Sequence, residues 1–147
     1  MPGAHATVVI GASPADVCAV ITDFANYPEF VPDVAQAVVL RTVPGDAPEW
    51  TVRFSLRVVR PIGYTLRLWA EPVHPDGTRV VRWSLVEGSV LRANEGSWTL
   101  SPCAEGTTVL YEVSVELALY VPSSLTRLLA GTNLPLMLTA FKDRLEA

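Results

Sequence analysis

The sequence predicts an α+β fold in which a curved antiparallel sheet of about seven strands wraps around a long C-terminal helix. Three observations support this: successive segments with a hydrophobic period of two, short turn sequences between them, and a final segment with helical periodicity. A sheet with one apolar face needs another element to cover it. Residues 123–146 form the remaining segment long enough to do so, because about 24 helical residues span roughly 36 Å. An apolar cavity is expected between the sheet and this helix.

A short β-type run at residues 7–10 is followed by a helix start signal. Ser13 is suited to the N-cap, Pro14 to the first helical position, and Asp16 to the third, where it completes a capping box. The apolar positions that follow recur at i, i+3, i+4 and i+7, which predicts one buried stripe on a helix of about three turns. They are Val17, Val20, Ile21 and Phe24.

Pro28 and Pro32 forbid a long second helix and predict one short helical turn starting at Pro28. From Val38 onward the hydrophobic period is two, which predicts half-buried antiparallel strands. The expected inward positions of one strand are Trp50, Val52, Phe54, Leu56 and Val58. The pattern recurs in residues 64–70, 81–85, 92–100 and 109–117, with turn sequences at residues 74–77, 88–89 and 102–106.

Two apolar stripes lie on nearly opposite sides of the C-terminal helical segment. Leu125, Leu128, Leu129 and Leu136 form the first, and Leu134, Leu138, Phe141 and Leu145 form the second. Because Pro135 cannot donate a hydrogen bond to the carbonyl of Gly131, a kink is predicted between these two residues. The first half is then expected to cover the cavity while the second half packs elsewhere. A straight helix buried on all sides is the alternative.

Composition argues against several classes of function. A net charge of −4 disfavours nucleic acid as a partner. No apolar run approaches the roughly 18 residues of a membrane span. The first positively charged residue is Arg41, so no secretory signal is readable and a cytoplasmic location is expected. Residues 1–147 are expected to form one domain, whose oligomeric state is left open.

The common catalytic and cofactor motifs are absent from the sequence, including the nucleophile elbow, the Walker loop and the dinucleotide-binding fingerprint. The two histidines, His5 and His74, lack the spacing of metal ligands, so neither a metal nor a cofactor is expected. Cys18 and Cys103 form no CxxC motif, and no disulfide is expected.

Tyr64, Tyr111 and Glu87 are weak candidates for catalysis, because strand alternation points them inward with the aromatic residues. A carboxylate in an apolar pocket can serve as a general acid or base. However, Glu87 lies at a strand end beside Gly88, where it can simply reach water. The tyrosines can equally be core residues with satisfied hydroxyl groups. No catalytic residue is therefore assigned.

Four arginines stand on the polar faces of neighbouring strands and could form a docking surface for an acidic partner. They are Arg53, Arg57, Arg67 and Arg82. Pairing with glutamates on adjacent strands is the simpler interpretation. The expected partners are Glu71, Glu112 and Glu116.

Four stretches carry a resemblance to a known family: residues 12–17 (ASPADV), 23–32 (DFANYPEFVP), 94–98 (NEGSW) and 106–108 (GTT). The sequence resembles the SRPBCC or START-like superfamily, and within it the polyketide cyclase/dehydrase and coenzyme Q-binding branch, which includes ribosome-association toxin-like proteins. The resemblance implies a helix-grip fold that binds a lipid, an isoprenoid quinone or a polyketide-like molecule in its cavity. It transfers no catalytic residue.

We therefore expect a binder or carrier of a hydrophobic small molecule, unless the inward residues close-pack a solid core. A polyketide aromatase/cyclase, with Tyr64, Tyr111 or Glu87 transferring protons, is the first alternative. A protein-interaction module of the ribosome-association toxin type, acting through Arg53 and Arg57, is the second. The residues expected to line the cavity are Phe54, Leu56, Leu66, Leu68, Trp83, Leu85, Trp98, Tyr111, Val113, Leu129, Asn133 and Met137.

Overall fold

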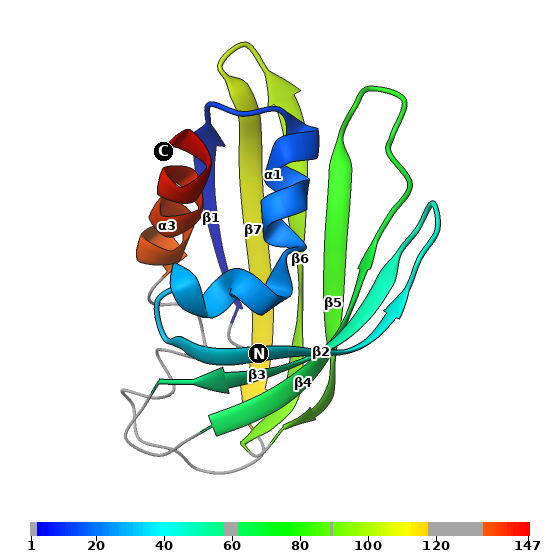
Figure 1. Cartoon of the computed structure of the whole chain (residues 1–147), viewed down its shortest axis with the longest axis vertical. Helices are drawn as coiled ribbons and strands as arrows, with labels where there is room; N and C mark the ends of the chain where they lie inside the picture. The colour runs from blue at the N-terminus through cyan, green and yellow to red at the C-terminus, as the bar shows by residue number, and fades with distance from the viewer. Residues whose placement is uncertain (1–2, 58–61, 89, 118–133) are drawn as a thin grey trace.

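The computed structural model describes residues 3–57, 62–88, 90–117 and 134–147 (Figure 1). Seven antiparallel strands form one sheet in the order β1-β7-β6-β5-β4-β3-β2. The elements in chain order are β1 (Gly3–Ile10), α1 (Pro14–Ile21), η1 (Phe24–Glu29), β2 (Val34–Val43), β3 (Glu49–Leu56), β4 (Ile62–Ala70), β5 (Arg79–Gly88), β6 (Leu91–Cys103), β7 (Gly106–Leu117) and α3 (Leu134–Glu146).

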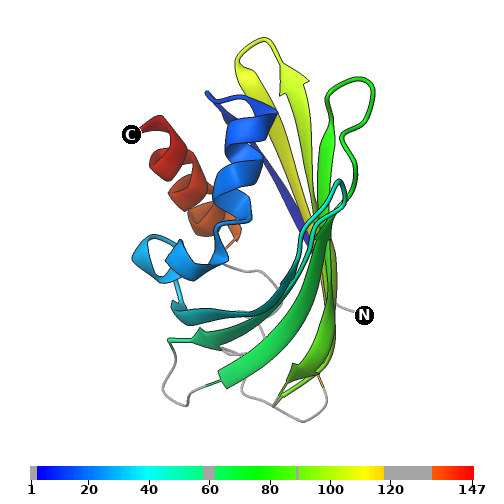
Figure 2. The ribbon, with the colours of Figure 1, turned by 45° about the vertical axis from the view of Figure 1, so that its right-hand side comes forward.

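The sheet curves strongly, and the helical elements lie on its concave side (Figure 2). Helix α1 contacts β5, β6 and β7, whereas α3 contacts β1 and α1. The predicted curved sheet with a C-terminal helix and short helices after the first strand is confirmed. No helix in the described ranges is long and apolar enough to cross a membrane.

Helix α1 begins as the sequence predicts. The hydroxyl of Ser13 accepts a hydrogen bond from the backbone N–H of Asp16 at 3.2 Å, and Pro14 occupies the first turn. Val17 and Ile21, four residues apart, are fully buried against the sheet. The N-cap and the apolar stripe therefore fix both the start of the helix and the face that it buries.

The short second helix does not start at Pro28, and this part of the prediction is wrong. A 3-10 helix, η1, begins at Phe24 and contains Pro28. Its first turn closes when Asn26 N–H donates to the carbonyl of Asp23 at 3.2 Å. Pro28 lies near the end of this helix, where the loss of one backbone donor does not prevent so short an element.

Strand alternation on β3 follows the sequence: Val52, Phe54 and Leu56 are buried on the concave side. Val58 lies outside the described residues. Strand β2 begins at Val34, four residues before the change of period at Val38, because Val34 already pairs with Leu56. The order of strands and turns is therefore as predicted, and backbone pairing extends β2 beyond the segment with a period of two.

Helix α3 buries the second of the two predicted stripes. Leu134, Leu138 and Phe141 are buried, while Leu136 is 63% exposed on the opposite side. The residues of the first stripe up to Leu129, and most of the predicted kink between 131 and 135, lie outside the described residues. Near its C-terminal end, α3 is tied to the start of the chain, because the Glu146 carboxylate accepts from Gly11 N–H at 2.8 Å.

Candidate functional site: an aromatic cavity under the C-terminal helix

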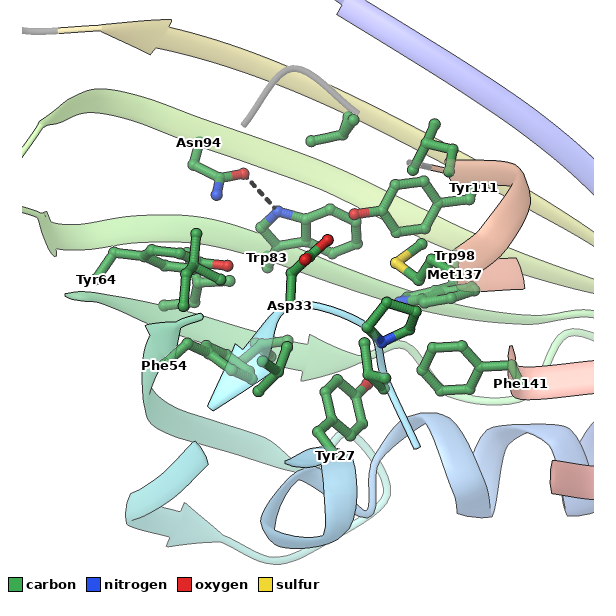
Figure 3. Close-up of a pocket in the computed structure, with 18 residues that line it drawn as sticks. Tyr27, Asp33, Phe54, Tyr64, Trp83, Asn94, Trp98, Tyr111, Met137 and Phe141 are labelled. Carbon is green, nitrogen blue, oxygen red and sulfur yellow. Dashed lines mark hydrogen bonds between the residues drawn. The ribbon is translucent and has the colours of Figure 1, made fainter. Parts of the chain in front are cut away.

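A cavity of about 160 Å³ lies between the concave face of the sheet and α3 (Figure 3). This volume is close to the roughly 150 Å³ that admits a benzene-sized ligand in an apolar protein interior. Seven of the described lining residues are aromatic: Tyr27, Phe54, Tyr64, Trp83, Trp98, Tyr111 and Phe141. The other described lining residues are Val31, Pro32, Asp33, Val34, Leu56, Leu66, Leu68, Asn94, Val113, Leu134 and Met137. The wall is therefore predominantly apolar.

Most of the residues predicted to point into the cavity meet there. Those that line it are Phe54, Leu56, Tyr64, Leu66, Leu68, Trp83, Trp98, Tyr111, Val113 and Met137. Leu129 and Asn133, which were also predicted to line it, lie outside the described residues. Leu85 packs against the margin of the core, and neither Leu85 nor Glu87 is among the lining residues.

A β-bulge explains why Glu87 does not face inward. Leu66 pairs with Leu85 but Thr65 pairs with Glu87, so β5 contains one extra residue, Val86. An extra residue in one strand interrupts the alternation of side chains. Val86 is 57% exposed and Glu87 is exposed as well. Glu87 therefore reaches solvent. The alternation of side chains holds up to Leu85 and is interrupted at the extra residue, Val86.

The aromatic residues form a connected wall. The ring centroid of Tyr111 lies 5.2 Å from that of Trp83 and 4.6 Å from that of Trp98. Trp98 also lies 5.0 Å from Phe141, whose ring is 5.5 Å from that of Tyr27. Such separations fall within the favourable range for aromatic pairs, so each ring restrains its neighbours.

Trp83 is held in one orientation by two neighbours on β6. Its indole N–H donates to Oδ1 of Asn94 at 3.0 Å, as Figure 3 shows. An indole N–H only donates, so the oxygen of Asn94 must face it and the amide nitrogen must point elsewhere. The six-membered ring occupies the space beside Gly96, where an added Cβ would lie 2.4 Å from Cζ2 of Trp83. A glycine is therefore required for this ring to lie against the strand.

The tyrosines of the cavity stay protonated at neutral pH. Burial raises the pKa of Tyr64 to about 12. Burial also raises the pKa of Tyr111, with a further contribution from Tyr64. The pKa of Tyr27 is raised mainly by burial, and its hydroxyl donates to the carbonyl of Ile21. At neutral pH these groups can form hydrogen bonds or polarise a carbonyl, but they are poor general bases.

Asp33 contributes a carboxylate to the described part of the cavity wall. It lies in the loop between η1 and β2 with a φ of 70°, and its side chain points into the cavity (Figure 3). Its own backbone carbonyl accepts from Arg57 N–H at 2.7 Å, which ties the loop to the end of β3. Among the described lining residues there is no arginine, lysine or histidine.

Sequence reasoning missed the cavity residues that strand alternation does not reach. Tyr27, Val31, Pro32 and Asp33 come from η1 and the loop after it, and Val34 begins β2. Asn94 could have been found, because it lies at even spacing from Trp98 on β6. No group of histidine, cysteine or carboxylate side chains suited to a metal occurs within the described part of the chain.

The expectation that the second half of the C-terminal helix packs away from the cavity is wrong. Leu134, Met137 and Phe141 of α3 all line it. Their spacing of three and four residues places them on one face of the helix. A helical wheel gives the relative directions of two stripes, but it does not tell which of them faces the sheet.

The sequence model of the family described as "Polyketide cyclase / dehydrase and lipid transport" matches residues 10–142. No curated protein matches the sequence significantly. A STAR-related lipid transfer protein from Xanthomonas axonopodis is 24% identical, with a TM-score of 0.80 over 99% of this chain and 86% of that chain. The Zhui aromatase/cyclase from Streptomyces sp. R1128 is 17% identical, with a TM-score of 0.78 over 98% and 93% of the two chains.

A START superfamily protein from Mycobacterium smegmatis is also similar in structure. It is 20% identical, with a TM-score of 0.78 over 98% of this chain and 97% of that chain. At these sequence identities the three structures are relatives in fold. They support the arrangement of the sheet and the helices. The ligand and any reaction must be argued from the residues that line the cavity of this protein.

Proposed function

The chain belongs to the polyketide cyclase/dehydrase and lipid transport family, and we propose that it binds a hydrophobic small molecule in the cavity under α3. The superfamily predicted from the sequence is confirmed by this match and by the START-type neighbours in structure. The observation that supports the proposal most directly is the cavity itself. Apart from the tyrosine hydroxyls and the indole N–H groups, its described polar lining consists of Asp33 and Asn94, so ligand burial there is favoured mainly by the hydrophobic effect.

A matched pair of substitutions on α3 tests this proposal. Met137 lines the cavity, whereas the adjacent Leu136 is exposed on the other side of the helix. Met137→Trp fills part of the cavity, and Leu136→Trp adds the same side chain to the surface. Binding is measured by the fluorescence of 1-aminonaphthalene, a small neutral dye that brightens in apolar surroundings.

We expect Met137→Trp to weaken dye binding at least tenfold, about 1.4 kcal/mol, and Leu136→Trp to leave it unchanged. Native mass spectrometry of the purified protein then identifies any apolar molecule that it retains. The proposal fails if the wild-type protein does not bind the dye. It also fails if both tryptophan variants bind it as well as the wild type does.

Polyketide cyclisation is a second candidate, because the hydroxyl groups of Tyr64 and Tyr111 line the cavity. A protonated tyrosine can donate to a substrate carbonyl and stabilise the negative charge that develops on its oxygen during carbon–carbon bond formation. The raised pKa of Tyr64 makes this hydroxyl a hydrogen-bond donor instead of a base. If the protein is a cyclase, Tyr111→Phe will abolish the cyclised product of a poly-β-ketone substrate while dye binding persists.

The interaction-module alternative depends on Arg53 and Arg57 being available to a partner. Arg57 instead donates to two backbone carbonyls, those of Val34 at 3.1 Å and Pro28 at 3.2 Å. This arginine therefore anchors the chain that enters β2. No observation on the described surface favours docking through these two residues over ligand binding in the cavity.

A further inference from the structure

A second hollow, which we name the outer groove, lies on the convex side of the sheet, opposite the helices (Figure 2). It is open to solvent and holds about 620 Å³. A row of paired residues crosses it from Trp69 on β4 to His5 on β1, with Arg82, Ser97 and Glu112 between them. Because neighbouring strands lie about 4.8 Å apart, this row spans roughly 19 Å. The outer groove is therefore long enough for a chain of several small units.

Serine side chains form the floor of the outer groove. Ser84, Ser97 and Ser114 point outward from β5, β6 and β7, and their small size leaves the space that the groove occupies. Ser97 is only 8% exposed, yet its hydroxyl is not sealed from solvent and forms no hydrogen bond with another described residue. Such a hydroxyl favours a ligand atom that can bond to it.

Groups of both charges border this floor. Arg82 donates from Nε to the carboxylate of Glu71 at 2.6 Å, which orients the guanidinium and leaves its terminal nitrogens to donate. Glu95 and Glu112 also line the groove, and neither forms an ion pair with another described residue. Hydrogen-bond donors and acceptors therefore lie close together along the groove.

Trp69 provides an apolar surface at one end of the outer groove. The guanidinium of Arg67 lies 4.7 Å from its ring centroid and restrains the indole. Arg67 is not among the described lining residues, whereas Trp69 is. An aromatic ring beside polar groups can pack against the C–H groups of a sugar ring while the sugar hydroxyls reach the polar groups.

Other classes of ligand fit these groups less well. Peptides are bound by pairing with an edge strand, in an apolar groove or by a cluster of basic residues. Here β5, β6 and β7 already pair on both sides, and the floor is polar. An anion would meet Glu95 and Glu112, and a cation would meet Arg82. A neutral molecule rich in hydroxyl groups can donate to the carboxylates and accept from the arginine and the serines.

From this arrangement we infer that the outer groove is a second binding site, which takes a neutral oligosaccharide. The inference goes beyond the proposed function and does not depend on it. Among the described lining residues, the outer groove and the cavity under α3 share Trp83 and Val113 alone. The polar groups that carry the inference lie on the opposite face of the sheet from the cavity.

NMR titration of the isotope-labelled protein with cellotetraose and maltotetraose tests the inference. The indole N–H of Trp69, assigned with Trp69→Phe, reports on the outer groove, and that of Trp98 reports on the cavity. We expect at least one sugar to shift the Trp69 signal saturably and to leave the Trp98 signal unchanged. The inference is wrong if neither sugar shifts the Trp69 signal at about 10 mM, where a ligand with a Kd of about 1 mM is nearly saturated. A shift of the Trp98 signal alone would also overturn it.

A matched pair of substitutions locates the site. Ser97→Val removes the hydroxyl and fills part of the floor, whereas Ser55→Val makes the same change on β3, outside the described lining of the groove. Valine is favourable in strands, so both variants should fold. We expect Ser97→Val to weaken sugar binding about tenfold, as the loss of one hydrogen bond and of space provides, and Ser55→Val to leave it unchanged. If Ser97→Val does not fold, Ser97→Ala replaces it. Equal binding by the Ser97 and Ser55 variants would contradict the inference.

Two further probes test the class of ligand. Tetragalacturonate, an anionic sugar of the same length, should bind more weakly than the neutral sugars, because Glu95 and Glu112 repel it. Tighter binding of this anion would show that the groove does not select a neutral ligand. A peptide of alternating glycine and serine should leave the Trp69 signal unchanged. If the peptide shifts that signal and the sugars do not, the outer groove is a peptide site and the inference is wrong.

Discussion

The two faces of the sheet place the same residue type in opposite surroundings. Trp83 on β5 faces the cavity, where Asn94 and Gly96 hold it in a single orientation. Trp69 on the adjacent β4 faces outward, where the guanidinium of Arg67 lies 4.7 Å from its ring centroid. Inner side chains are held by packing and by buried hydrogen bonds, whereas outer ones are held by contacts that water and salt weaken.

The outer face has a regular order of its own. Pairing across five strands aligns Trp69, Arg82, Ser97, Glu112 and His5 in one row. Its ion pairs are exposed, as in the contact between Arg82 and Glu71. Pairs of this kind contribute about 0–1 kcal/mol each. The inner face therefore determines stability and shape, whereas the outer face tolerates change.

The largest expected difference between inner and outer positions lies on α3. Phe141 is 1% exposed and contacts rings on three sides, whereas Leu136 is mostly exposed. Phe141→Ala should lower the free energy of unfolding by about 3–5 kcal/mol. Leu136→Ala should change it by less than about 0.5 kcal/mol. Urea denaturation of both variants checks this, and similar losses would show that the helix does not bury one face.

Gly63 on β4 and Gly96 on β6 differ in the room that they leave for a side chain. A Cβ on Gly96 would lie 2.2 Å from the carbonyl oxygen of Glu112, whereas the nearest atom to a Cβ on Gly63 is 3.6 Å away. Gly96→Ala should therefore destabilise the fold by about 1–3 kcal/mol through overpacking. Gly63→Ala should have little effect. A shifted indole N–H resonance of Trp83 in Gly96→Ala alone would locate the strain in the cavity wall.

High pH should lower the stability of the protein through the buried Tyr64 on the inner face. The raised pKa of Tyr64 means that the folded protein keeps a proton which the unfolded chain releases above pH 10. Stability is therefore complete below pH 10 and falls as the pH rises toward 12. At pH 11 the loss from Tyr64 should be about 1 kcal/mol. Unfolding by urea at pH 8 and pH 11 measures it. Tyr64→Phe should lose less stability than the wild type over this range.

The smallest effect is expected on the outer face. Arg82→Ala breaks an exposed pair with Glu71 and should lower the free energy of unfolding by no more than about 1 kcal/mol. Because salt screens exposed charges, this difference should shrink further in 1 M sodium chloride. Urea denaturation at low and high salt provides the measurement. A large loss of stability that is independent of salt would show that the outer face does not tolerate substitution.

Much of the cavity wall could be predicted from the sequence. Phe54, Trp83, Trp98 and Tyr111 follow from alternation, because every second side chain of a strand points to the same face. Glu87 could not be placed in this way, since the bulge at Val86 is formed by pairing with β4 and has no local signature. Alternation is reliable along a strand only as far as its register is uninterrupted.

Residues from loops and helices needed the tertiary structure. Tyr27 and Asp33 reach the cavity because η1 and the following loop are folded back over the sheet. Phe141 was placed on the wrong side, since a helical wheel does not reveal which stripe a neighbouring element covers. In the structure, contacts of α3 with β1 and α1 orient the helix and turn Phe141 toward Trp98.

By itself, the sequence determined the order of the elements, the start of α1 at the Ser13 cap and the inward face of most strands. These properties depend on local periodicity and capping, which act over a few residues. Only the tertiary structure decided which face of α3 closes the cavity, where the bulge redirects Glu87, and how Asn94 and Gly96 fix Trp83. Those outcomes depend on residues distant in sequence, and packing alone brings them together.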